Sequence, residues 1–166
     1  MNESEFERCV RQHLNSVYLT ALYYLKNKSD AEDVAQDVFF KLCTYNGDFS
    51  DDAHLKAWLL KCAANESKNL LRSHWYKYSL PLETAGELPD PGASGFTDTD
   101  NELLGALDSL GRNNRVVLYM FYYEGYSIAE TAQILGISER AVSSRLRRGR
   151  KQLKALLESG KESETI

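Results

Sequence analysis

The stretch Tyr126–Lys154, YSIAETAQILGISERAVSSRLRRGRKQLK, predicts two helices joined by a tight turn. Ser127 and Glu130 have the spacing of a capping box, and apolar residues then recur at helical intervals. Gly136 supplies the positive φ that ends a helix, and Ser138 is placed to cap the next one. This order of signals is typical of a helix-turn-helix.

The second helix of this stretch has two opposite faces at 100° per residue. An apolar sector contains Val142, Leu146 and Leu153, and the opposite stripe contains Arg140, Ser144, Arg147 and Lys151. In the major groove Arg pairs with guanine edges, while other cations bind phosphates and set the register. An ordinary solvated basic helix is the alternative. The predicted DNA-binding residues are Arg140, Ser143, Ser144, Arg145, Arg147, Arg148 and Lys151.

Composition restricts the class of protein. The chain has 166 residues, 43% of them hydrophobic, and no apolar run of membrane-spanning length. Its N-terminus lacks the basic start and apolar centre of a signal peptide, so we expect a cytoplasmic protein without membrane insertion. The three cysteines form no CxxC pair and are expected to be reduced and buried. We predict no metal, no cofactor and no enzymatic activity.

The net charge of −4 is unevenly distributed along the chain. Residues 1–77 carry −1, residues 78–111 carry −7 and residues 112–166 carry +4. The middle segment also contains all three prolines, which predicts an extended acidic linker. We therefore expect an all-α protein with two small helical domains, at 1–77 and 101–158, a flexible linker at 78–100 and a polar tail at 159–166.

Three helices are predicted in the first domain. The first has an apolar stripe of Phe6, Val10, Leu14, Val17, Ala21 and Leu25, and a loop at 26–28 ends it. A Ser29/Glu32 capping box is expected to start the second. Its buried stripe is predicted to be Ala31, Val34, Val38, Leu42 and Tyr45. The third is expected from about His54 to Trp75, with Leu55, Leu59, Cys62 and Leu70 in the core.

Two surfaces of this domain have candidate functions. Acidic and amide groups on the second helix could meet a basic partner, or merely offset the helix dipole by about 0.3–1 kcal/mol. On the third helix Lys61, Asn65, Lys68 and Arg72 form a stripe, with Asn69 beside it, which ends near Trp75 and Tyr76. Cations interleaved with aromatic rings suit unpaired bases and phosphates. The loop with Phe49 and Ser50 could hold a base or merely turn the chain.

In this order, the parts resemble the extracytoplasmic-function sigma factors of bacterial RNA polymerase over nearly the whole chain. DAEDVAQDVFFKL, Asp30–Leu42, is similar to the family segment that docks on core polymerase. The docking residues that this resemblance implies are Asp30, Glu32, Asp33, Gln36, Asp37 and Phe40. The family also implies promoter DNA and an anti-sigma factor as partners.

The remaining motifs extend the resemblance to DNA recognition. LKAWLLKCAANESKNLLR, Leu55–Arg72, is similar to the helix that reads the upstream melted promoter element, and the loop around Phe49 corresponds to its flipped-base pocket. The melted-element residues so implied are Phe49, Ser50, Lys61, Asn65, Lys68, Asn69, Arg72, Trp75 and Tyr76. Two departures concern promoter strength: Ala141 stands where the family has Thr, and SHWYK, Ser73–Lys77, replaces a string of arginines.

Two other classes of protein are compatible with parts of the sequence. A stand-alone helix-turn-helix regulator would bind a two-fold operator as a dimer, but it leaves the acidic helix and the Lys61–Arg72 stripe without a role. A thiol or metal hydrolase would need Cys9, His13 and His54 or His74 at one site. No nucleophile–base–orienter pattern in the sequence places these groups together.

Overall fold

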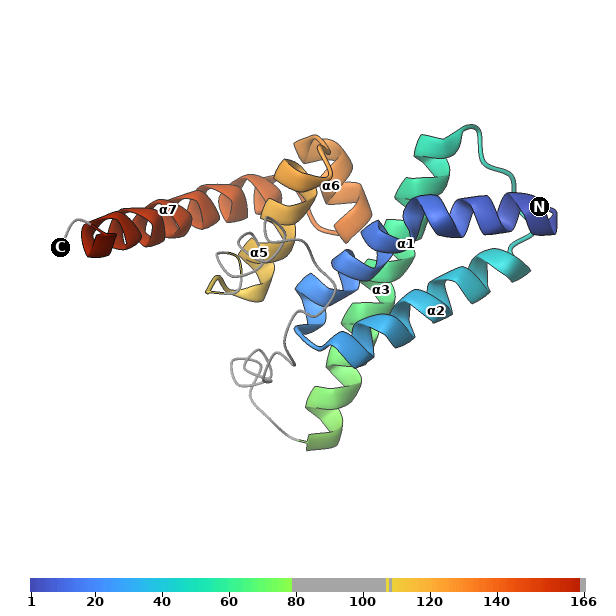
Figure 1. Ribbon diagram of the computed structural model, residues 1–166, viewed down its shortest axis with the longest axis horizontal. Coiled ribbons are helices and arrows are strands. Elements are labelled where there is room, and N and C mark those ends of the chain that lie inside the picture. Colours follow the sequence, from blue (N-terminus) through green and yellow to red (C-terminus); the bar gives the residue numbers. More distant parts are fainter. Residues whose placement is uncertain (79–106, 108, 165–166) are drawn as a thin grey trace. The chain divides into compact units, whose positions relative to one another are not determined.

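The computed structural model describes residues 1–78, 107 and 109–164, with side chains described for 1–73, 107 and 109–158. The secondary-structure elements of these residues are all helices, without a strand, which confirms the all-α prediction. The chain divides into two compact units (Figure 1). The first contains helices α1 to α3, and the second contains α5, η2, α7 and most of α6. Residues 79–100 of the predicted linker lie outside the described part.

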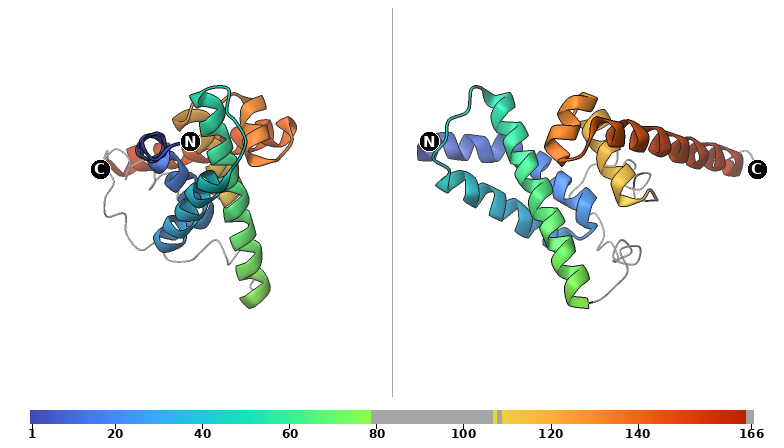
Figure 2. Two further views of the ribbon diagram at one scale, coloured as in Figure 1. Left: turned by 90° about the vertical axis from the view of Figure 1, so that its right-hand side faces the viewer. Right: turned by 180° about the vertical axis from the view of Figure 1, so that it is seen from behind.

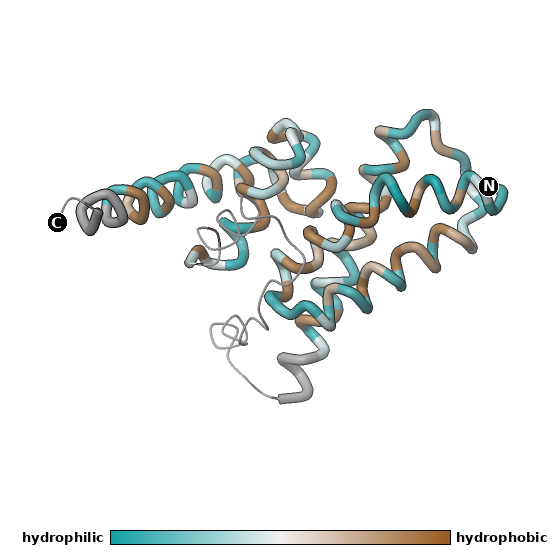
Figure 3. Tube along the Cα trace, viewed as in Figure 1, coloured by the Kyte–Doolittle hydropathy of each residue, from teal (hydrophilic) through white to brown (hydrophobic). Residues whose placement is uncertain are grey.

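Helices α1 (Glu3–Leu25), α2 (Lys28–Thr44) and α3 (Asp52–Tyr78) pack on one another in the first unit. The core between these helices contains residues that are 0% exposed, namely Val17, Ala21, Val38 and Leu59. Apolar and polar segments alternate along α1 and α2, as expected for helices with one buried face (Figure 3).

The interior face of α1 differs from the predicted stripe. Leu14 is 45% exposed and Phe6 and Val10 are half-buried, whereas Cys9 and His13 are buried. Successive helical residues point 100° apart, so Leu14 lies at the edge of a face that His13 and Val17 occupy. The predicted buried position of Leu14 is therefore wrong, and a histidine lies in the core in its place.

The start of α2 also corrects the sequence prediction. The N-cap is Asn27, whose side chain accepts a hydrogen bond from the Asp30 amide at 2.9 Å, so no Ser29/Glu32 capping box forms. Asparagine is as good an N-cap as serine, and its position one residue before the helix satisfies the Asp30 amide. At the other end, Tyr45 follows the helix and is 44% exposed, so its predicted burial is wrong.

Helix α3 begins at Asp52, two residues before the predicted start, and runs to Tyr78, which the sequence had placed in the linker. Leu55 and Leu59 are buried as predicted, whereas Cys62 and Leu70 are half-buried. The C-terminal part of α3 extends past α1 and α2 (Figure 2).

In the second unit, the helix-turn-helix signals are confirmed. The Ser127 hydroxyl accepts from the Glu130 amide and the Glu130 carboxylate accepts from the Ser127 amide, both at 3.1 Å. Helix α6 (Ile128–Leu135) ends at Gly136, whose φ is +68°. The Ser138 hydroxyl then caps α7 (Glu139–Glu164) by accepting from the Ala141 amide at 3.1 Å.

Two features of this unit have no counterpart in the sequence analysis. Helix α5 (Arg112–Leu118) continues directly into η2, a π-helix at Tyr119–Tyr123. Helix α5 also packs closely on α7, because Gly149 is buried against Leu118. A Cβ at Gly149 would lie 2.6 Å from Leu118 Cδ1, so the absence of a side chain permits this approach.

Candidate nucleic-acid interface

Helix α7 presents a cationic surface opposite its buried face. Val142 and Leu146 are 0% and 1% exposed. Of the predicted DNA-binding residues, the exposed ones are Arg140, Ser143, Arg147, Arg148 and Lys151. Ser144 and Arg145 are half-buried, so the expected position of Ser144 on the fully exposed stripe needs correction.

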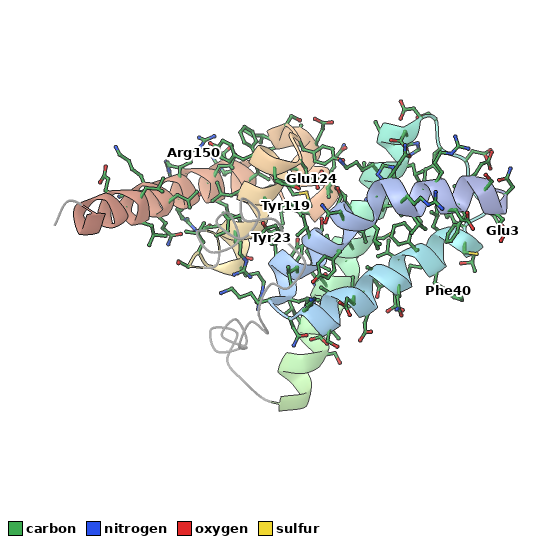
Figure 4. The ribbon with its side chains drawn as sticks, in the orientation of Figure 1. Glu3, Tyr23, Phe40, Tyr119, Glu124 and Arg150 are labelled. Carbon is green, nitrogen blue, oxygen red and sulfur yellow. The ribbon has the colours of Figure 1, made fainter. Side chains whose placement is uncertain are left out.

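Arg150 is not part of this surface, although it belongs to the same basic run. Its guanidinium lies over the rings of Phe121 and Tyr122, at 5.6 and 5.5 Å from their centroids, and Nε donates to the Tyr122 hydroxyl. Figure 4 labels Arg150 on α7. Both aromatic residues belong to η2, so their contacts with the Arg150 guanidinium hold α7 against η2.

A shallow groove of about 820 Å³ lies between the first turns of α6 and α7. Arg140 and Ser143 line it beside two carboxylates, Glu130 and Glu139. Both glutamates are exposed. Glutamate accepts hydrogen bonds from cytosine amino groups and repels phosphates, so the groove combines groups suited to base edges. Its cation, Arg140, was predicted from the sequence, whereas Glu139 was not.

The connection between α2 and α3 carries a cluster of aromatic rings. Tyr45 lies 5.3 Å from Phe49 and 4.8 Å from Trp58, measured between ring centroids. Phe49 and Trp58 are 5.5 Å apart in an edge-on arrangement. Tyr45 also lies on the backbone of Gly47, where a Cβ would be 2.5 Å from the Tyr45 Cζ. Phe49 and Trp58 are half-buried, so these rings keep accessible surface.

The predicted stripe on α3 is largely exposed. Lys61, Asn65, Asn69 and Arg72 are exposed, and Lys68 is half-buried. The helix therefore presents two amides and at least two cations along one side. The side chains of Trp75 and Tyr76 lie outside the described residues, although the backbone there is helical.

The acidic surface of α2 is opposite its buried stripe. Its exposed members are Glu32, Asp33, Gln36, Asp37 and Phe40, while Asp30 is half-buried. The Phe40 side chain is 71% exposed and lies on the outer side of α2 (Figure 4). A large exposed phenyl ring among carboxylates is a feature of protein-binding surfaces. The carboxylates of this surface repel the phosphates of nucleic acid.

Among the groups considered for a hydrolase, Cys9, His13 and His54 do not form an activated nucleophile, and the side chain of His74 lies outside the described residues. Burial raises the pKa of the Cys9 thiol, and the charge of Asp52 raises it further, which favours the unreactive thiol form. His13 is 4% exposed, and its Nε2 lies 2.9 Å from the Asp52 carboxylate. His54 instead accepts from Ser50. Within the described residues no three metal-ligating side chains cluster.

A second, apolar groove lies in the second unit, and the sequence analysis did not find it. Its volume is about 620 Å³, and it lies between η2 and the C-terminal half of α7. Tyr122, Tyr123 and Leu157 line it and are 57%, 42% and 63% exposed. Exposed aromatic and leucine side chains at one groove indicate a protein-binding surface.

No helix in the described part of the chain has the length and apolarity to span a membrane.

Comparison with known proteins places both units in one family. Residues 9–76 match the model of Sigma-70 region 2, and residues 100–153 match that of Sigma-70 region 4. The ECF RNA polymerase sigma factor SigM of Mycobacterium tuberculosis is 30% identical, over 92% of this chain and 76% of the relative. The RNA polymerase sigma factor CnrH of Cupriavidus metallidurans is 29% identical, over 97% of this chain and 91% of the relative.

Solved structures share this fold. The sigma factor RpoE of Bartonella quintana, in complex with the anti-sigma factor NepR, matches with a TM-score of 0.70 at 23% identity, over 93% of this chain and 97% of that one. CnrH in complex with the cytosolic domain of CnrY matches with a TM-score of 0.62 at 25% identity, over 95% and 90%.

An all-α chain with a helix-turn-helix and matches to both sigma regions is a transcription initiation factor. It belongs to the ECF sigma factors of bacterial RNA polymerase. Proteins of this class direct core polymerase to promoters, and the polymerase itself performs the nucleotidyl transfer.

Proposed function

We propose that this sigma factor binds core polymerase through α2, reads duplex promoter DNA through α7, and captures melted promoter bases through α3 and the loop before it. The observation that carries the proposal is the cationic surface of α7, which lies opposite a buried apolar face and is free of the contacts that hold Arg150. Each of the three surfaces then has its own target: core polymerase for α2, duplex promoter DNA for α7, and unpaired promoter bases for α3.

The α2 surface fits a protein partner better than DNA. Its exposed carboxylates repel phosphates, and the 71% exposed Phe40 supplies an apolar anchor of the kind that dominates protein interfaces. We assign core polymerase to this surface, with Asp30, Glu32, Asp33, Gln36 and Asp37 around the anchor. Phe40→Ala should weaken binding to core polymerase while leaving duplex DNA binding by α7 unchanged.

The α3 surface and the aromatic cluster suit unpaired bases. Extruding a base costs a few kcal/mol, and stacking on an aromatic ring returns about 1–3 kcal/mol per base. Phe49 and Trp58 provide rings, Asn65 and Asn69 provide amides for base edges, and Lys61 provides charge for the backbone. We include Ser50, Lys68, Arg72, Trp75 and Tyr76 in this surface.

The division of the chain completes the proposal. We assign residues 1–77 to core binding and the melted element, 78–100 to an acidic linker, 101–158 to the duplex element, and 159–166 to a tail. Such a factor works in the cytoplasm, where the polymerase is. The sigma factor RpoE forms a complex with the anti-sigma factor NepR, and CnrH forms one with the cytosolic domain of CnrY, which supports an anti-sigma factor as a further partner. The apolar groove beside Tyr122 and Leu157 is a surface for a protein chain.

The test is start-site mapping of transcripts made on genomic DNA by sigma-free bacterial core polymerase, with and without this chain. New start sites that share two spaced motifs are the expected result. Binding to duplex DNA without any new start site would favour a stand-alone regulator and remove the polymerase assignment of α2.

A pair of variants separates the two DNA surfaces. Arg147→Ala should weaken binding to duplex promoter DNA, because it removes an exposed cation from α7. Asn65→Ala should leave duplex binding unchanged and reduce promoter opening, measured by permanganate reactivity of unpaired thymines. Equal effects of both variants on both steps would refute the division.

A further inference from the structure

The loop that carries Phe49 is held by a histidine whose role the sequence analysis did not identify. The Ser50 amide donates to Nδ1 of His54 at 3.1 Å, and the Ser50 hydroxyl lies 3.3 Å from the same nitrogen. The imidazole ring also meets Phe49 edge-on, at 5.3 Å between centroids. One side chain therefore contacts both the backbone of the loop and the aromatic ring.

This arrangement is a variant of the capping box. The Asp51 carboxylate accepts from the His54 amide at 2.7 Å, as an N-cap does at the start of α3. In the usual box a Glu or Gln side chain at the third helical position returns to the N-cap amide. Here His54 returns to the amide one residue earlier, that of Ser50. The imidazole thus extends the cap into the loop.

The start of α3 contacts a buried residue of α1, so His54 acts from a defined position. Asp52, the first residue of the helix, lies 2.9 Å from Nε2 of His13, which is 4% exposed on α1. The anchor sets the position of the helix, and His54 transmits that position to Ser50 and Phe49. Tyr45 and Trp58 complete the cluster against Phe49.

We propose that His54 is a positioning residue for promoter opening: through its Nδ1 acceptor and its ring edge it holds Ser50 and Phe49 in the arrangement that receives an unpaired promoter base. This rests on the proposed function, which assigns the loop to the melted element. His54 itself need not touch the base. A preformed cluster accelerates opening because the loop is already ordered when a base leaves the stack.

Two substitutions separate the contributions of the acceptor and the ring. His54→Asn keeps an acceptor oxygen near the position of Nδ1 and removes most of the ring, whereas His54→Phe keeps the ring and removes the acceptor. If the Ser50 hydrogen bond sets the loop, His54→Phe should slow opening about fivefold or more, the equivalent of one weakly stacked base, and His54→Asn should restore most of the rate. Phe49→Ala is the reference for loss of the cluster.

The experiment uses the full chain with core polymerase and a promoter fragment found by start-site mapping. The probe is 2-aminopurine, placed singly at each upstream melted position, whose fluorescence rises when the base unstacks. Duplex binding of the free chain and the thermal midpoint are measured for each variant. A merely structural role would lower the midpoint and affect all probe positions equally, whereas positioning affects the probe at the captured base.

The outcomes are distinct. Slow opening in Phe49→Ala and His54→Phe, with recovery in His54→Asn and unchanged duplex binding, supports the inference. Slow opening in Phe49→Ala alone overturns it and leaves the proposed function intact. Equal defects in His54→Phe and His54→Asn overturn the role of the Ser50 hydrogen bond. If the wild-type chain opens no promoter with core polymerase, the proposed function fails, and the inference fails with it.

Discussion

The contact between Gly149 and Leu118 predicts that Gly149→Ala destabilises the protein when residue 118 is leucine and stabilises it when residue 118 is alanine. In an ordinary helix interior, Gly→Ala stabilises by about 1 kcal/mol. At Gly149 the new Cβ would lie 2.6, 3.0 and 3.4 Å from Cδ1, Cγ and Cδ2 of Leu118. Carbon atoms at optimal contact are about 3.5–4.0 Å apart, so α5 or α7 must shift by roughly 1 Å.

The magnitude follows from the two opposing contributions. Leu118 is 2% exposed and also lines the apolar groove beside η2, and we take an overpacking cost of about 1–3 kcal/mol. Subtracting about 1 kcal/mol of helix propensity, we expect Gly149→Ala to destabilise the second unit by roughly 1 kcal/mol. In a Leu118→Ala background the obstructing atoms are gone. There Gly149→Ala should stabilise by about 1 kcal/mol, a coupling of about 2 kcal/mol in total.

The assay is native-state hydrogen exchange of the amides in α5 and α7, which reports opening of this unit directly. Tryptophan fluorescence is an internal control, because both tryptophans, Trp58 and Trp75, precede the second unit. Comparing Lys151→Ala with Lys151→Gly measures the Gly–Ala difference at an exposed site of the same helix. The reasoning is refuted if Gly149→Ala stabilises both backgrounds by the same amount.

Four further predictions concern α7 and the thiols. Ser138→Ala removes the cap of α7 and should cost about 1 kcal/mol, seen as faster exchange in its first turn, whereas an unchanged rate would deny the cap a role. Affinity for duplex promoter DNA should fall steeply with salt, and Arg147→Ala should reduce the slope of log K against log salt by about 1; an unchanged slope would remove this residue from the phosphate contacts. Cys43 is exposed, so the expected burial of all three thiols is wrong; iodoacetamide should modify Cys43 before buried Cys9, and the opposite order would contradict the burial. Because burial raises the pKa of Cys9, only the unfolded chain loses this proton near the ordinary thiol pKa; the free energy of unfolding should therefore fall as pH rises above about 8.5, less so in Cys9→Ser.

Local signals in the sequence were sufficient for the helix-turn-helix. The capping box at Ser127 and Glu130, the positive φ of Gly136 and the cap at Ser138 involve residues within a few positions of one another. Such signals depend on the backbone geometry of one turn, so a single sequence contains them in full. The opposite faces of α7 follow from helical periodicity for the same reason.

Choices between equally good local signals were less predictable. Ser29 and Asn27 are both suitable caps for α2, and packing on α1 selects the register that begins at Lys28. Likewise, the apolar Leu14 is 45% exposed while the polar His13 is buried, because His13 finds a partner in Asp52, 39 residues away. Helical periodicity relates residues a few positions apart, so it does not predict a contact between residues this distant in the sequence.

By itself, the sequence determined the helical class, the division of charge along the chain, the turn at Gly136 and the cationic stripe of α7, because each is a property of composition or of neighbouring residues. Only the tertiary structure decided which cations of the basic run contact aromatic rings and what holds the loop that carries Phe49. The Arg150 guanidinium lies over the ring of Tyr122, and Gly149 lets α5 approach α7. The aromatic cluster exists because α2 and α3 bring Tyr45 and Trp58 onto Phe49. These groups meet only through long-range packing, because packing buries apolar surface and forms hydrogen bonds between helices that are distant in the sequence.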